Sequence, residues 1–101
     1  MRDSFDLPGQ EADEAKAAEL RRFKRQQQID DIKWLMGHPQ GRRFVTRLLE
    51  ETGLRRTSFN TSGSVMALQE GRKQLGYFLE GELLEIAPDG YLKLLMEYRS
   101  E

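Results

Sequence analysis

The chain has 101 residues, of which 38% are hydrophobic and 33% are charged, with a formal net charge of −1 and no cysteine. This length fits one domain with one modest core, and the composition is polar for a globular protein. The lack of cysteine excludes disulfides and thiolate metal ligands, and the balanced charge argues against simple attraction of the whole molecule to nucleic acid. No stretch approaches 18 consecutive apolar residues, so we expect neither a signal sequence nor a membrane span.

Glycine and proline punctuate the chain and divide it into predicted helices. After the turn at Leu7-Pro8-Gly9, no Gly or Pro occurs until Gly37, and helix-forming residues dominate the interval. The helices are expected at residues 11–36, 39–52, 64–86 and 88–98. No segment has a convincing strand pattern. The predicted fold class is therefore all-α: a small helical domain of about four helices with a long N-terminal helix.

The long first helix changes character along its length. Its first half is charged on all sides and has no large apolar residue before Leu20. We therefore expect residues 1–18 to form an N-terminal tail and a weakly anchored helix start, and residues 19–101 to form the helical domain. The second half is apolar on two sides, one with Leu20, Phe23 and Trp34 and the other with Ile29, Ile32 and Met36. Such a helix is either wrapped by its own domain or shared with a neighbouring molecule.

Apolar residues at helical spacing predict the core of the other helices. The expected core residues are Phe44, Leu48, Leu75, Phe78, Leu79 and Leu95. Gly71, Gly76 and Gly81 interrupt the third helix, each at a cost of about 1 kcal/mol relative to Ala, which suggests that another helix crosses close by. A second, thinner stripe on that helix is formed by Met66, Tyr77 and Leu84. A chain of this length cannot easily bury both stripes, so part of this surface is expected to bind a partner.

No group of residues has the composition of a catalytic, cofactor or metal site. His38 is the only histidine and precedes Pro39 at a helix start, so a turn or capping role is favoured over ligation. Glu82 falls within an apolar stripe, where a carboxylate is usually paired, and Arg42 or Arg56 would suit it. We therefore expect a protein without enzymatic activity, cofactor or metal.

The middle of the chain is basic. Residues 37–73 carry seven Lys and Arg against three acidic residues, whereas residues 74–101 carry two against six. Segment 42–73 therefore leaves nucleic-acid binding open, although the loop after the second helix is too long for a helix-turn-helix. Arg42 and Arg72 lie at the edges of apolar stripes, which indicates structural roles for both side chains. Arg43, Arg55 and Arg56 are expected to be exposed.

A fixed order of short motifs runs through the second and third predicted helices. It comprises Gly41-Arg42-Arg43-Phe44, Leu48-Leu49-Glu50, Gly53, Ser58-Phe59 and Glu70-Gly71-Arg72 with Gly76, followed by a segment from Pro88 to Glu97. This pattern resembles a family of small tailed-bacteriophage proteins found in short-tailed phages, including one of Bordetella. The similarity covers about residues 31–97. Thr57 and Gln69 depart from the family pattern, which has Ser and Asn at these positions.

The resemblance implies a protein encoded among virion-structure genes, with no established catalytic activity. We therefore expect a structural or accessory protein of the virion, made in the bacterial cytoplasm, that binds other virion proteins during particle assembly or genome ejection. Self-association is a further option. The expected partner-binding side chains are Arg43, Arg55, Arg56, Phe59, Trp34, Met66, Tyr77 and Leu84. The alternative is a nucleic-acid-associated accessory protein that uses the basic segment 42–73.

Overall fold

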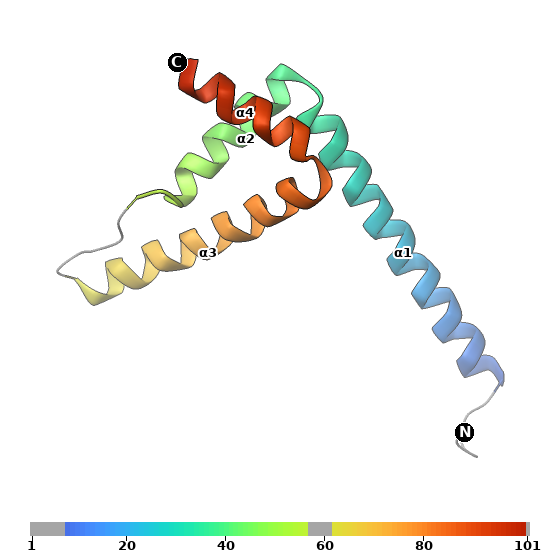
Figure 1. Cartoon of the computed structure of the whole chain (residues 1–101). Helices are drawn as coiled ribbons and strands as arrows, with labels where there is room; N and C mark the ends of the chain where they lie inside the picture. Colours follow the sequence, from blue (N-terminus) through green and yellow to red (C-terminus); the bar gives the residue numbers. More distant parts are fainter. Residues whose placement is uncertain (1–7, 57–61, 101) are drawn as a thin grey trace. The chain divides into compact units, whose positions relative to one another are not determined.

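A computed structural model describes residues 8–56 and 62–100, and this part of the chain consists of α-helices without a strand (Figure 1). The helices are α1 (Pro8–Met36), α2 (Pro39–Thr52), α3 (Gly63–Ile86) and α4 (Pro88–Ser100). The predicted all-α fold is confirmed. Each predicted helix is present, and the ends of α2 fall where they were predicted.

The helix boundaries follow from local capping chemistry. Pro39 occupies the first turn of α2, where its missing N–H is not needed, and His38 precedes it in the extended conformation that is favoured before proline. His38 is the N-cap residue of α2, but its side chain makes no capping hydrogen bond. Gly53 ends α2 with φ 67°, a left-handed conformation that costs glycine little, and its N–H donates to the Glu50 carbonyl. The Ser62 side chain accepts from the N–H of Val65 and so caps the start of α3.

The chain divides into two compact units, residues 1–31 and residues 32–101. In the described part of the first unit, α1 exposes most of its side chains, including Leu20 and Phe23. The second unit contains the last turn of α1 together with α2, α3 and α4. Ile32 and Met36 from that last turn pack into its core, whereas Trp34 is 65% exposed. One of the two predicted apolar sides of the helix is therefore packed there, and the other is not.

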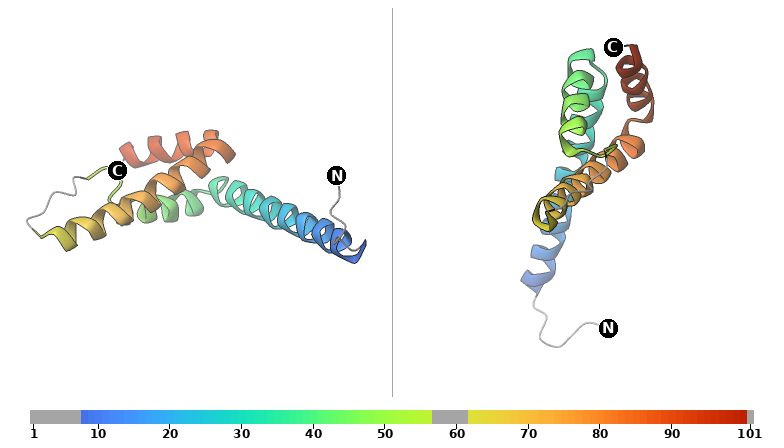
Figure 2. Two further views of the ribbon diagram at one scale, coloured as in Figure 1. Left: turned by 90° about the horizontal axis from the view of Figure 1, so that it is seen from below. Right: turned by 90° about the vertical axis from the view of Figure 1, so that its left-hand side faces the viewer.

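The core of the second unit is small. Each of α2, α3 and α4 contacts the other two (Figure 2). Five apolar side chains are at most 5% exposed, and they come from all four helices: Met36, Val45, Leu83, Tyr91 and Leu94. Partly buried residues such as Leu49 and Leu95 pack around them.

The prediction of the core is wrong for four of its six residues. Leu79 and Leu95 are half-buried, but the other four are exposed: Phe44 (56%), Leu48 (37%), Leu75 (52%) and Phe78 (61%). The physical reason is that the face of α3 in contact with its neighbours centres on Gly76 and Leu83. On a helix with 3.6 residues per turn, that face lies about 90° or more around the axis from Leu75 and Phe78.

Only one of the three α3 glycines marks a helix crossing. A Cβ atom added to Gly76 would lie 2.5 Å from Thr52 Oγ1 and 3.1 Å from Leu54 Cβ, so the end of α2 presses directly against α3. A Cβ added to Gly71 or Gly81 would meet no described atom within 4 Å. The expectation of a close crossing is therefore confirmed at Gly76 and wrong at the other two.

Candidate interaction surface

Arg42 is a buried structural residue that ties three helices together. Its Nε donates to Glu97 Oε1 at 2.9 Å, and its Nη1 donates to the Met36 carbonyl at 3.0 Å. The side chain of Arg42 is 9% exposed. Its hydrogen bond to Glu97 holds the pKa of that carboxyl below the usual value of 4.5. The structural role predicted for Arg42 is confirmed, but its acceptors are Glu97 and Met36, so the suggested pairing with Glu82 is wrong.

A second polar cluster joins the turn after α2 to α3 and α4. The Tyr91 hydroxyl donates to Glu80 Oε2 at 2.6 Å, and Arg55 Nη2 donates to the Tyr91 oxygen at 3.0 Å. Arg55 Nη2 also lies 3.3 Å from Glu80 Oε2. Burial, followed by the hydrogen bond to Glu80, raises the pKa of Tyr91 above 10.0. The side chain of Arg55 is 66% exposed, so its Nη2 binds within this cluster while the rest of the side chain is largely accessible to solvent.

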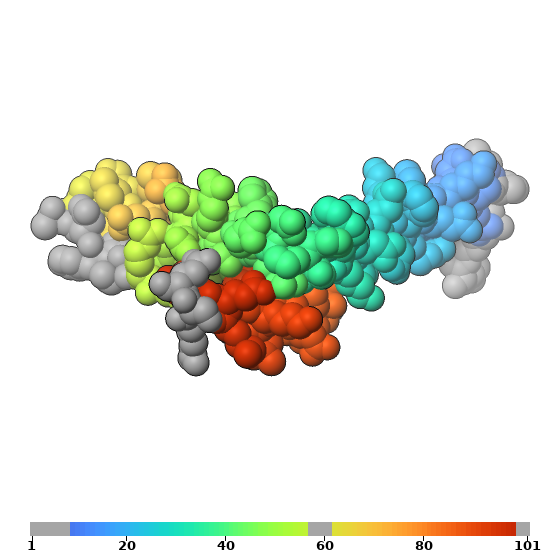
Figure 3. All heavy atoms as spheres, turned by 90° about the horizontal axis from the view of Figure 1, so that it is seen from above, coloured from blue at the N-terminus to red at the C-terminus, as the bar shows by residue number. Residues whose placement is uncertain are grey.

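Next to this cluster lies a groove of about 310 Å³, which we call the α2–α4 groove. Its lining residues are Thr46, Leu49, Glu50, Gly53, Leu54, Arg55, Arg56, Tyr91, Leu94, Leu95 and Tyr98. Figure 3 shows α2 and α4 side by side on the face viewed there. Leucine side chains from both helices contribute apolar surface to the groove. Arg55 and Arg56 add positive charge from the turn after α2, and Arg56 Nη2 is held by the Glu50 carbonyl.

Two of the predicted partner-binding residues flank the polar cluster on α3. Tyr77 precedes Glu80 by three residues and Leu84 follows it by four, which places both beside the Glu80 carboxylate on the helix surface. Tyr77 is 53% exposed and Leu84 is 51% exposed. The structure therefore gathers Arg55, Tyr77 and Leu84 around one ion pair, and Arg56 lies in the adjoining groove.

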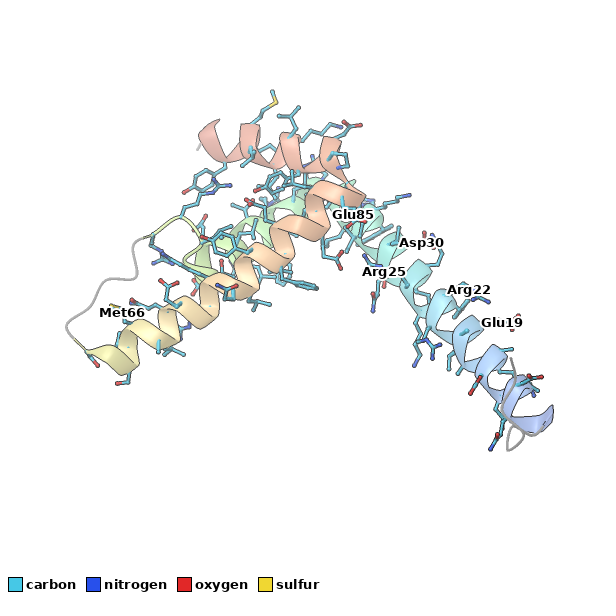
Figure 4. All side chains as sticks on the ribbon, turned by 60° about the horizontal axis from the view of Figure 1, so that its bottom comes forward. Glu19, Arg22, Arg25, Asp30, Met66 and Glu85 are labelled. Carbon is cyan, nitrogen blue, oxygen red and sulfur yellow. The ribbon has the colours of Figure 1, made fainter. Side chains whose placement is uncertain are left out.

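The other predicted residues are not brought to this surface by any described contact. Arg43 is exposed on α2, and Met66 is half-buried near the start of α3 (Figure 4). The Trp34 ring stacks on His38 with the ring centroids 4.4 Å apart. Phe59 lies outside the described residues.

A family model described as Bbp19-like phage protein matches residues 32–96. The match covers more than half of the chain and begins where the second compact unit begins. The chain belongs to the Bbp19-like phage protein family. The phage resemblance drawn from the motifs is thereby confirmed, with nearly the same extent. Neither the curated proteins nor the solved structures contain a match to the chain.

In this Bbp19-like protein, acidic residues neutralise part of the basic segment. Arg42 pairs with Glu97 and Arg55 pairs with Glu80. Lys73 lies 3.9 Å from Glu70. The structural role predicted for Arg72 is wrong, because Arg72 is exposed and lines a small cavity of about 100 Å³ beside the end of α2. The exposed arginines of the segment are Arg43, Arg47, Arg55, Arg56 and Arg72.

Sequence reasoning missed several residues of the groove and of the polar cluster beside it. Tyr91 and Tyr98 share one face of the last predicted helix, but the sequence does not show that this face meets α2. Glu80 carries no local signal, because its partners are 11 and 25 residues away. Leu54 was recognisable only as the apolar residue that follows a glycine cap.

The residues that the structure describes offer neither a membrane span nor a metal site. Within them, no helix combines the length and the apolar character needed to cross a membrane. In the same part of the chain, no three His, Asp or Glu side chains are grouped so that they could hold a metal ion.

Proposed function

We propose that this Bbp19-like protein is a non-enzymatic component of the phage particle that acts by binding other virion proteins, in particle assembly or genome ejection. The observation that supports this proposal is the surplus of apolar surface on the second unit. Five apolar side chains are buried there, whereas twelve large apolar side chains of its described residues are exposed. Exposed apolar side chains that form contiguous patches mark sites of protein–protein contact.

The α2–α4 groove is the part of this surface best suited to a protein partner. It combines leucine side chains and Tyr98 with two arginines, and Tyr and Arg are the residue types that contribute most to binding energy at protein interfaces. Arg55 is already oriented by Tyr91 and Glu80, so little conformational freedom remains to be lost on binding. The expected ligand is a segment of another virion protein that carries apolar side chains and a carboxylate for the arginines.

Substitution of Tyr98 tests the groove, with Met96 as the matched control. Both are exposed residues of α4, at 51% and 61%, but only Tyr98 lines the groove. Each variant is supplied to a phage that lacks the gene, and its amount in purified particles is measured. We expect Tyr98→Ala to reduce incorporation by about tenfold or more and Met96→Ala to leave it near wild type. Full incorporation of a folded Tyr98→Ala variant would show that the groove is not the contact site.

The nucleic-acid alternative rests on the exposed arginines of segment 42–73. Pairing of Arg42, Arg55 and Lys73 with carboxylates weakens it, because a phosphate would have to compete with those acids. Titration of duplex and single-stranded DNA at several salt concentrations separates the two functions. We expect no measurable salt-dependent binding. A steep fall of affinity with salt, equivalent to about three or more phosphate contacts, would favour the nucleic-acid role.

A further inference from the structure

Helix α3 carries a seam of six residues at alternating spacings of four and three. The seam residues are Leu68, Arg72, Leu75, Leu79, Glu82 and Ile86. This spacing places all six on one stripe of the helix, as at the contact positions of a coiled coil. Leu68 is 57% exposed and Leu75 is 52% exposed. Arg72 is exposed, and the other three residues are half-buried.

The α3 seam is a different surface from the α2–α4 groove. Tyr77 and Leu84 border the polar cluster beside that groove, and they lie roughly 160–180° around the helix axis from Leu75. Filling the groove would therefore not cover the exposed part of the seam.

The seam is complementary to itself when its direction is reversed. In one antiparallel register, Leu68 faces Ile86, Leu75 faces Leu79, and Arg72 faces Glu82. A single alignment thus satisfies all six positions, with apolar residues opposite apolar residues and opposite charges paired. Under two-fold symmetry each of these pairs occurs twice.

We propose that a second copy of this chain docks on the α3 seam, with the two α3 helices antiparallel and related by a two-fold axis. The charge pattern selects this occupant and this direction. The first half of the seam carries Arg72 and the second half carries Glu82, so a parallel arrangement in register would place like charges opposite each other. Glu82 also has an interaction within its own chain, and a carboxylate has two oxygens with which to accept a further donor.

Phe78 gives the dimer additional apolar surface at its centre. It is 61% exposed and lies beside the seam residues Leu75 and Glu82, from which it is separated by three and four residues on the helix. In the proposed register the two copies of Phe78 lie close to the two-fold axis and next to each other. Met66 and Glu85 mark the two ends of α3 in Figure 4, and the Met66 end of one copy would lie beside the Glu85 end of the other. This inference goes beyond the proposed function and does not depend on it.

Sedimentation equilibrium of the purified full chain over a wide concentration range tests the dimer directly. A seam of this length is at the small end of specific interfaces, so concentrations from about 10 to 500 µM are needed. We expect a reversible monomer–dimer equilibrium in the wild type. Arg72→Glu should weaken it at least about tenfold by facing Glu82 of the other copy, and Arg72→Glu with Glu82→Arg should restore it to within about threefold. A wild type that stays monomeric, or an Arg72→Glu variant that dimerises like the wild type, would overturn the proposal.

Cysteine cross-linking tests the register, because the chain has no cysteine of its own. Phe78→Cys is expected to be cross-linked between the two copies by a short bifunctional maleimide, because the axes of packed helices lie about 8–10 Å apart and a direct disulfide would be too short. Tyr77→Cys is the matched control, since Tyr77 is the adjacent residue and has similar exposure, but lies on the side of α3 that faces away from the seam. Circular dichroism confirms that both variants are folded. Equal cross-linking of the two variants, or none in a folded Phe78→Cys variant, would contradict the proposed arrangement.

Discussion

Replacing a glycine of α3 by alanine should have opposite effects at two positions five residues apart. Alanine is favoured over glycine in a helix by about 1 kcal/mol, so Gly81→Ala should stabilise the fold by about 0.5–1 kcal/mol, because its added Cβ meets no described atom within 4 Å. At Gly76 the same gain applies, but the Cβ would lie 2.5 Å from Thr52 Oγ1 and 3.0 Å from Thr52 Cβ.

Thr52 cannot yield easily at this contact. It is 4% exposed, its branched side chain is stiff, and its hydroxyl donates to the Leu49 carbonyl. Overpacking of this kind costs about 1–3 kcal/mol, so Gly76→Ala should be destabilised by up to about 2 kcal/mol after the helix gain is subtracted. Urea unfolding of both variants measures the difference in their free energies of unfolding, and an m-value equal to that of the wild type shows that the comparison is valid. If Gly76→Ala were as stabilising as Gly81→Ala, α2 and α3 would not cross at Gly76.

The remaining predictions concern the core, two titrating groups and the start of α1. Leu94→Ala should lower the free energy of unfolding by about 2–5 kcal/mol, and Leu75→Ala should lower it by less than about 1 kcal/mol, as measured by urea unfolding. Equal losses would indicate that Leu75 belongs to the core, as the sequence predicted. Arg42 lowers the pKa of Glu97, so the stability from this pair is present above pH 4.5 and is lost as the pH falls; Glu97→Gln should flatten that loss in acid unfolding curves. Tyr91 has a raised pKa, so its contribution is present below pH 10 and is lost as the pH rises; Tyr91→Phe should reduce the fall in stability above pH 10, and an unchanged fall would show that Tyr91 is not its source. Residues 11–18 should exchange their amide hydrogens rapidly, and slow exchange in the isolated protein would contradict the weak anchoring predicted for them.

The helices could be predicted from the sequence because their ends depend on nearby residues. Gly53 adopts a left-handed conformation, and Pro39 and Pro88 begin helices, so each boundary is determined within a few residues of chain. The family could be predicted for a similar reason, since its motifs are ordered combinations of neighbouring residues.

The core could not be predicted with the same success, because periodicity shows which residues share a face and not which face is buried. Phe44 and Val45 both lie near the apolar side of α2, yet only Val45 is buried. The choice depends on where α3 and α4 pack, and that depends on Gly76, Met36 and Tyr91, whose contacts are distant in sequence. The same limit explains Arg72, whose position at the edge of a stripe was compatible with either a packed or an exposed side chain.

Quantitative mass spectrometry of gradient-purified phage particles tests most directly whether this Bbp19-like protein is a virion component. The proposed function predicts that the chain co-purifies with the particles at a constant ratio to the major capsid protein across the particle peak. A chain that is abundant in the infected-cell lysate but absent from the purified particles would contradict it.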